Sequence, residues 1–208
     1  KIASGTIDLC YIDPPFNSKR TYNQIYNNIG EEDRAQSQAF IDTWTWNDLA
    51  IEGYQEILDN IDGRFTKQTI ELIKGLRNVL DTGSLLAYLV SMTLRVTEIQ
   101  RVLKSTGSFY LHCDPTASHY LKLVIDSVFV PKGGDYQNEI IWSYRRWTGE
   151  AKRFLRMHDI VFFYTKSNEH TFNSQFTAYT DKSLARKQHY HTRIKGDDVY
   201  VTSIDERG

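Results

Sequence analysis

Ile7-Asp8-Leu9-Cys10-Tyr11-Ile12-Asp13-Pro14-Pro15-Phe16 is the stretch of sequence that decides the fold. Apolar residues alternate with Asp8 and Cys10 and the run ends in Ile12, a pattern typical of a mostly buried strand. Prolines fix φ and donate no N–H, so the strand stops before them and Asp13 lies at its carboxyl end. Ligands bind at that edge in open α/β sheets. The stretch therefore predicts an α/β fold with a site at Asp13.

The residues from Asp13 to Phe16 suit chemistry on the amino group of a flat heterocycle. Such an amine is a poor nucleophile because its lone pair is delocalised into the ring. Hydrogen bonds from its two protons to the Asp13 carboxylate and the Pro14 carbonyl would localise the lone pair for attack on an electrophilic methyl group. Pro15 would set the turn, and Phe16 would offer a face on which a base can stack.

Further elements can be read along the chain. The polar stretch from Asn17 to Gln38 is expected to be a mobile loop that closes over the substrate. Ser84 is expected to cap a long helix that runs to about Lys104. Further strands are expected at 109–113, parallel to the first, at 139–142 and at 160–164, of which the last is apolar enough to lie within a sheet.

Three stretches, in order and spacing, resemble a known family. They are Ile12 to Asn17 with Tyr22-Asn23; Gly107-Ser108-Phe109-Tyr110-Leu111-His112-Cys113-Asp114-Pro115 to Tyr120-Leu121-Lys122; and Asn138-Glu139-Ile140-Ile141-Trp142 with His158 to Lys166. On these stretches the chain resembles the amino-group DNA methyltransferases, which methylate adenine N6 or cytosine N4, and among them the bacterial type III-like enzymes. The resemblance implies an α/β, Rossmann-like methyltransferase sheet with helices on both faces.

The resemblance also implies a function. It implies site-specific transfer of a methyl group from S-adenosylmethionine to an exocyclic amine of a flipped base in double-stranded DNA. Adenine N6 is the preferred target, because Asp-Pro-Pro-Phe enzymes of this family are mostly adenine methylators. Asp13, Pro14, Pro15 and Phe16 would be the catalytic residues, and Asp13 and Asp114 would lie beside the cofactor. A restriction subunit is an implied partner. The alternatives are a cytosine N4 methyltransferase and a catalytically incomplete DNA-binding module. A protein glutamine methyltransferase is disfavoured, because that family begins its motif with Asn.

One part of the family pattern is absent. These enzymes carry a Gly-rich turn after a strand, and the sequence contains no Gly-x-Gly. In the β order of motifs the catalytic tetrapeptide comes first and the Gly-rich turn comes near the C-terminus. The chain is therefore expected to be the front, catalytic-motif half of a β-order enzyme, which puts cofactor binding by this chain alone in doubt.

Basic residues suggest where DNA would lie. Lys19 and Arg20 follow the catalytic turn. Cations and aromatic residues interleave in Tyr144-Arg145-Arg146-Trp147 and in Lys152-Arg153-Phe154-Leu155-Arg156, a pattern that suits contact with phosphates and bases. Solvated loop charges are the alternative at each place. Asp114 also fits a helix cap, His112 an ordinary strand histidine, and His158-Asp159 a pair that orients the basic loop.

Composition sets the remaining expectations. The chain has 208 residues, 40% of them hydrophobic, and a formal net charge of −1, which neither favours nor excludes nucleic acid. Residues 1–167 are expected to form the catalytic domain and 168–208 to begin a target-recognition region. Cys10 and Cys113 fit reduced thiols without metal-ligand spacing. No apolar run is long enough for a membrane span, so a cytoplasmic protein is expected, and an apolar sheet edge favours a homodimer.

Overall fold

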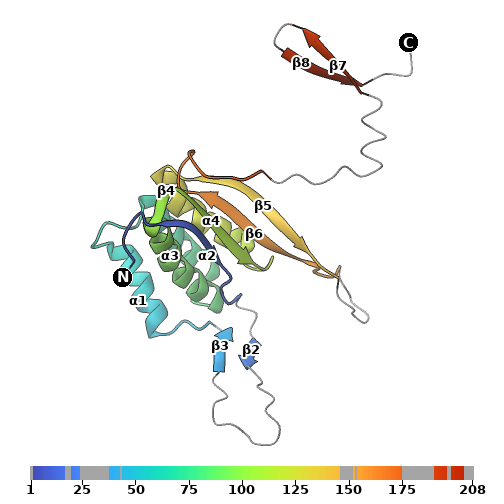
Figure 1. Cartoon of the computed structure of the whole chain (residues 1–208). Helices are drawn as coiled ribbons and strands as arrows, with labels where there is room; N and C mark the ends of the chain where they lie inside the picture. Colours follow the sequence, from blue (N-terminus) through green and yellow to red (C-terminus); the bar gives the residue numbers. More distant parts are fainter. Residues whose placement is uncertain are drawn as a thin grey trace, which may run out of the picture. The chain divides into compact units, whose positions relative to one another are not determined.

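A computed structural model describes residues 2–16, 20–23, 38–42, 44–145, 152, 154–174, 190–195 and 198–203 (Figure 1). The chain divides into two compact units, Lys1–Thr171 and Phe172–Gly208. This division falls close to the boundary expected after residue 167. The assignment of the second unit to target recognition stays a prediction.

The first unit is built on a four-stranded sheet with the order β1-β4-β6-β5. β1 pairs in parallel with β4, as the sequence predicted, while β6 runs antiparallel to both of its neighbours, β4 and β5. β6 is internal, in agreement with its continuous apolar sequence. The strands are β1 (Ile7–Ile12), β4 (Leu103–Cys113), β5 (Asp135–Ser143) and β6 (His158–Thr165).

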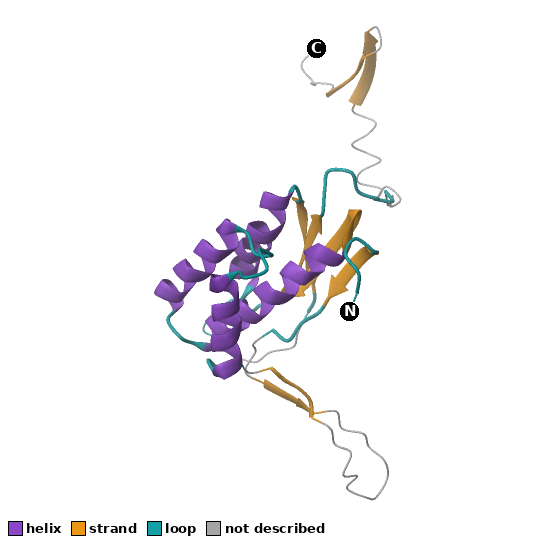
Figure 2. Ribbon diagram, turned by 90° about the vertical axis from the view of Figure 1, so that its left-hand side faces the viewer, coloured by secondary structure: helices purple, strands orange, loops and turns teal. Residues whose placement is uncertain are grey.

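The helices are packed against one face of this sheet (Figure 2). α3 and α4 contact the strands directly, and α1 and α2 pack against α3 and α4 as an outer layer. The helical elements are α1 (Asp48–Asp59), α2 (Lys67–Leu80), α3 (Ser84–Val102), α4 (Ser118–Phe129) and the short 3-10 turn η1 (Val130–Lys132).

The alternation of side chains along the strands explains this one-sided packing. Phe109, Leu111 and Cys113 point from β4 into the core and are fully buried. On the other face, Leu9, Tyr11 and Trp142 are each more than half exposed. The α/β fold class is thus confirmed, but within the described residues the helices cover a single face, and helices on both faces are not observed there.

The long helix begins with a different cap from the one that the sequence suggested. Gly83 is the N-cap of α3, no side chain caps this end, and Ser84 is already helical. The helix ends at Val102, and β4 begins at the next residue. Lys166 donates from Nζ to the carbonyls of Leu103 (2.5 Å) and Arg101 (3.3 Å), which satisfies oxygens at this helix end.

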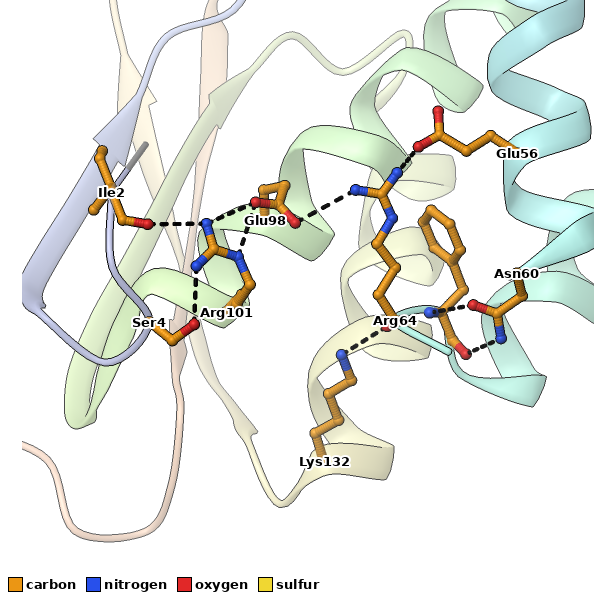
Figure 3. Close-up of polar contacts among 9 residues, drawn as sticks. Ile2, Ser4, Glu56, Asn60, Arg64, Glu98, Arg101 and Lys132 are labelled. Carbon is orange, nitrogen blue, oxygen red and sulfur yellow. Dashed lines mark hydrogen bonds and ion pairs between the residues drawn. The ribbon is translucent and has the colours of Figure 1, made fainter. Parts of the chain in front are cut away.

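A polar network fixes the segment that leads into β1 (Figure 3). Arg101 donates to the backbone oxygen of Ile2 and to Oγ of Ser4, and its guanidinium also holds Glu98. Arg64 pairs with Glu98 and with Glu56. Because Arg101 lies at the end of α3, this network ties the segment before β1 to that end of the helix.

Two further strand pairs lie outside the four-stranded sheet. β2 (Arg20–Asn23) lies within the stretch expected to be a loop and pairs in antiparallel fashion with β3 (Gln38–Asp42), which begins where that stretch ends. The stretch is therefore not a loop throughout. In the second unit, β7 (Tyr190–Lys195) and β8 (Asp198–Ser203) form another antiparallel pair. Among the described residues, no helix combines the length and apolar character needed to cross a membrane.

Candidate active site

Four strand ends meet at one edge of the main sheet. β1 and β4 are parallel, so the residues that follow them, Asp13 and Asp114, leave the sheet on the same side. The antiparallel strands contribute the start of β6 and the end of β5, where Trp142 pairs with Asp159. Chemistry-bearing side chains from distant parts of the sequence are therefore brought together at this edge.

The Asp-Pro-Pro-Phe turn stands directly beside β4. The Asp13 side chain is 59% exposed, while Pro14, Pro15 and Phe16 are half-buried. The ring of Phe16 meets the ring of His112 edge to face, with 5.0 Å between their centroids. An accessible carboxylate thus lies next to a fixed aromatic ring.

His112 lies between two carboxylates. Its Nδ1 is 3.1 Å from Oδ1 of Asp13, and its Nε2 is 3.6 Å from Oδ2 of Asp159. The hydroxyl of Tyr144 donates to the other Asp159 oxygen at 3.1 Å. The ring of Trp142 lies roughly parallel to the His112 ring, with 6.5 Å between centroids. The sequence had favoured an ordinary strand histidine, and the structure instead places His112 in contact with the candidate catalytic carboxylate.

Asp114 organises the turn between β4 and α4. Its carboxylate accepts hydrogen bonds from the backbone N–H of Thr116 (3.1 Å) and from the Thr116 hydroxyl (2.7 Å). Arg156 reaches the same turn, where Nη1 lies 2.5 Å from Oγ1 of Thr116 and 3.7 Å from the Asp114 carboxylate. Asp114 thus caps the turn that leads into α4, whose own N-cap is Ala117. Its role beside a cofactor stays a prediction.

The electrostatic character of the edge is acidic. Burial, and secondly the negative charge of Asp13, raise the pKa of Tyr11 above its ordinary value. Burial also raises the pKa of the Cys113 thiol, with further contributions from the charges of Asp114, Glu139 and Asp159. Both effects favour the neutral forms, so neither side chain is an anionic nucleophile near neutral pH.

The comparison with known families agrees with this geometry. A model of N6 and N4 methyltransferases, described as DNA methylase, matches residues 7–204. The chain belongs to the DNA methylase family. Its members methylate amino groups of DNA bases, and the match extends from the first strand, across the strand-end cluster, into the second unit of the chain. A search of curated proteins found no match.

The methyl donor of this family is S-adenosylmethionine, and a Gly-rich turn for it is not found after β1 or β4. The turns that follow β1 and β4 contain Asp-Pro-Pro and Asp-Pro and no glycine. Gly107 lies away from these turns, within β4, where an added Cβ would come within 3.1 Å of the Ile7 carbonyl oxygen. Gly133 has a φ of +85° and ends η1. These glycines serve backbone packing and a turn.

The DNA-contact residues expected from the sequence are only partly described. Lys19, Arg146 and Arg153 lie outside the described residues, and for Arg20 only the backbone is described. Arg145 and Lys152 are exposed, which agrees with contact to a ligand without testing it. Arg156 is exposed by about half but is engaged by Asp114 and Thr116. Within the described residues there is no group of three or more metal-ligating side chains.

Sequence reasoning undervalued three residues of this site, His112, Asp159 and Tyr144. Each stands at a strand end, and a register that aligns Ile12 with Leu111 and Cys113 with Ile160 is needed to bring them together. The signal in the sequence was the polarity of His112 and Asp159 beside apolar neighbours. That signal marks a site only when both strands are known to end at the same edge.

Proposed function

We propose that this chain forms the base-accepting part of a site-specific DNA methyltransferase that methylates N6 of adenine in a flipped base. The observation that carries the proposal is the exposed Asp13 carboxylate, held at the carboxyl end of β1 beside the half-buried Phe16. Membership of the DNA methylase family restricts the reaction to amino groups of bases. S-adenosylmethionine, when bound, would supply an electrophilic methyl group.

The roles of the side chains follow from the chemistry of the amine. Asp13 and the carbonyl of Pro14 accept the two N–H groups, which favours a pyramidal nitrogen with a localised lone pair. The new N–C bond forms as the methyl group leaves the sulfonium. The nitrogen then loses one proton to water or to the Asp13 carboxylate. Phe16 stacks against the flipped base, and the exposed Trp142 offers a second aromatic surface at the same edge.

Double-stranded DNA is the proposed partner, bound through basic residues of the segment that joins β5 to β6. Arg145 and Lys152 are its described, exposed cations. Their positive charge would offset the acidic edge formed by Asp13, Asp114 and Asp159 and would contact phosphates. Specific readout is proposed for the second unit, Phe172–Gly208.

The test is methyl transfer from labelled S-adenosylmethionine to unmethylated duplex DNA by the complete gene product that contains this chain. The modified nucleoside is identified by mass. Asp13→Ala is expected to lower the rate by about 10²- to 10³-fold, the usual cost of losing one group that stabilises the transition state. Asp8→Ala is the matched control, because Asp8 lies on the same strand but pairs with Lys104 near the strand's other end.

The outcomes separate the alternatives. Label in N6-methyladenine that is lost with Asp13→Ala and kept with Asp8→Ala supports the proposal. Label in N4-methylcytosine would leave the enzyme class intact and change the base. No transfer by a protein that still retains DNA would instead indicate a binding module.

A further inference from the structure

We propose that His112 is a positioning residue for Asp13: its Nδ1 holds one carboxylate oxygen so that the other oxygen faces the amine of the target base. On the other side of the ring, Nε2 of His112 faces Asp159, whose carboxylate is held by Tyr144. The inference rests on the proposed function, because it assigns a role within the same site.

The Asp13 side chain requires such a support. It follows the last residue of β1 and is 59% exposed, so rotation about its side-chain bonds is not restricted by packing on its exposed side. Within the described part of the chain, the contact of its carboxylate is with His112, which is 3.1 Å away. A carboxylate that must meet an amine in one geometry loses rate when its orientation is free.

His112 is well suited to provide this support, because its ring is itself fixed. The side chain is only 16% exposed. Phe16 meets the ring edge to face at 5.0 Å, and Trp142 lies beside it at 6.5 Å. β4 holds the backbone between β1 and β6. The imidazole is therefore held with Nδ1 toward Asp13 and Nε2 toward Asp159.

Asp159 and Tyr144 complete a chain of polar contacts behind the ring. Nε2 of His112 is buried without a hydrogen bond, 3.6 Å from Oδ2 of Asp159, while Oδ1 of Asp159 accepts a hydrogen bond from Tyr144. The backbone N–H of Tyr144 donates to Met157, which closes the ends of β5 and β6 together. A buried polar nitrogen that lacks a hydrogen bond is costly. The position of the ring between Asp13 and Asp159, at the cost of an unpaired Nε2, is explained if the ring serves Asp13.

Three substitutions of His112 separate positioning from packing. The amide nitrogen of Asn can occupy the place of Nδ1, and that of Gln can occupy the place of Nε2. His112→Asn thus keeps a donor toward Asp13, His112→Gln places a donor toward Asp159 and none toward Asp13, and His112→Leu offers neither. Asn and Gln are matched in chemistry and differ in which carboxylate they reach.

The experiment measures kcat, KM for duplex DNA and DNA affinity for the complete gene product, with a thermal unfolding scan of each variant. We expect kcat to fall about 10- to 100-fold in His112→Gln and His112→Leu, and to stay within about threefold of wild type in His112→Asn. KM and DNA affinity should not change. Asp159→Asn, which preserves shape, should lower kcat by a smaller factor and serves as the second test if a His112 variant does not fold.

The results distinguish the two proposals. A wild-type protein without methyl transfer would overturn the proposed function itself. An active wild type with equal kcat in the Asn and Gln variants would overturn the positioning role alone. A change confined to KM or DNA affinity would also overturn it, since His112 would then act in binding.

Discussion

Two glycines that look alike in the sequence should respond to the same substitution with opposite sign. Gly134 is buried just before β5, and a Cβ added there would lie 2.8 Å from the Thr165 carbonyl oxygen and 3.0 Å from the ring of Phe129. The first of these atoms is backbone and cannot move without disturbing the pairing of β5 with β6. Gly75 lies in the exposed middle of α2, where an added Cβ would meet nothing within 4 Å.

The magnitudes follow from these surroundings. Overpacking of a tight interior site costs about 1–3 kcal/mol, so Gly134→Ala should lower the free energy of unfolding by that amount. In an exposed helix interior, replacing Gly by Ala contributes about 1 kcal/mol, so Gly75→Ala should raise it. For a protein of this size, 1 kcal/mol corresponds to roughly 2–4 °C in Tm. Thermal unfolding followed by circular dichroism, with urea unfolding at constant m-value, measures both effects.

Three results would refute this reasoning. Gly134→Ala with an unchanged or higher Tm would mean that the close approach of Thr165 to this site is wrong. Gly75→Ala with a lower Tm would mean that the exposed face of α2 is covered in the intact protein. Equal shifts of the same sign would show that the contrast between the two sites does not hold.

Two further predictions concern charge. The hydrogen bond from Arg101 holds the pKa of Glu98 in the folded protein below its usual range. Glu98 therefore stabilises the folded protein at any pH above its unfolded pKa of about 4.3, and this stabilisation is lost as the pH falls through the lower folded pKa. The Tm advantage of wild type over Glu98→Gln should therefore be present at pH 6 and vanish in acid, and a pH-independent advantage would contradict this. Arg145→Ala should weaken DNA binding and reduce the salt slope of log Kd by about one, because an exposed cation releases about one counterion. Arg156→Ala is its control and should leave the slope nearly unchanged, since Arg156 is engaged by acidic and hydroxyl groups; equal slopes for the two variants would contradict the assignment.

Much of the fold was predictable from local patterns. The alternation from Ile7 to Ile12 and the two following prolines predicted a strand and its carboxyl end, and both were confirmed. The expected burial of that strand was wrong, because one face of the sheet is uncovered there and Leu9 and Tyr11 are more than half exposed. The continuous apolar run at 160–164 predicted an internal strand, which β6 is. These features depend on period-two alternation and on the missing N–H of proline, which act within a few residues.

Other features were not predictable, because they depend on more than local residue type. The N-cap of α3 shifted from Ser84 to Gly83, because the cap is set by the backbone angles at which the chain enters the helix, and Gly83 has the extended ones. The antiparallel pairing of β2 with β3 was missed, because β2 is short and polar and carries little hydrophobic signal.

The sequence by itself determined the candidate catalytic turn, the strand that carries it and the family of amino-group DNA methyltransferases, because these are written in contiguous residues. Only the tertiary structure decided what surrounds Asp13. His112 is 99 positions away, and Asp159 and Tyr144 lie in other parts of the chain again, so their meeting depends on strand register and on which ends share an edge. Tertiary contacts also decided that Arg156 meets Asp114 and Thr116. Side-chain distance across a sheet is set by pairing, and pairing is a property of the folded chain.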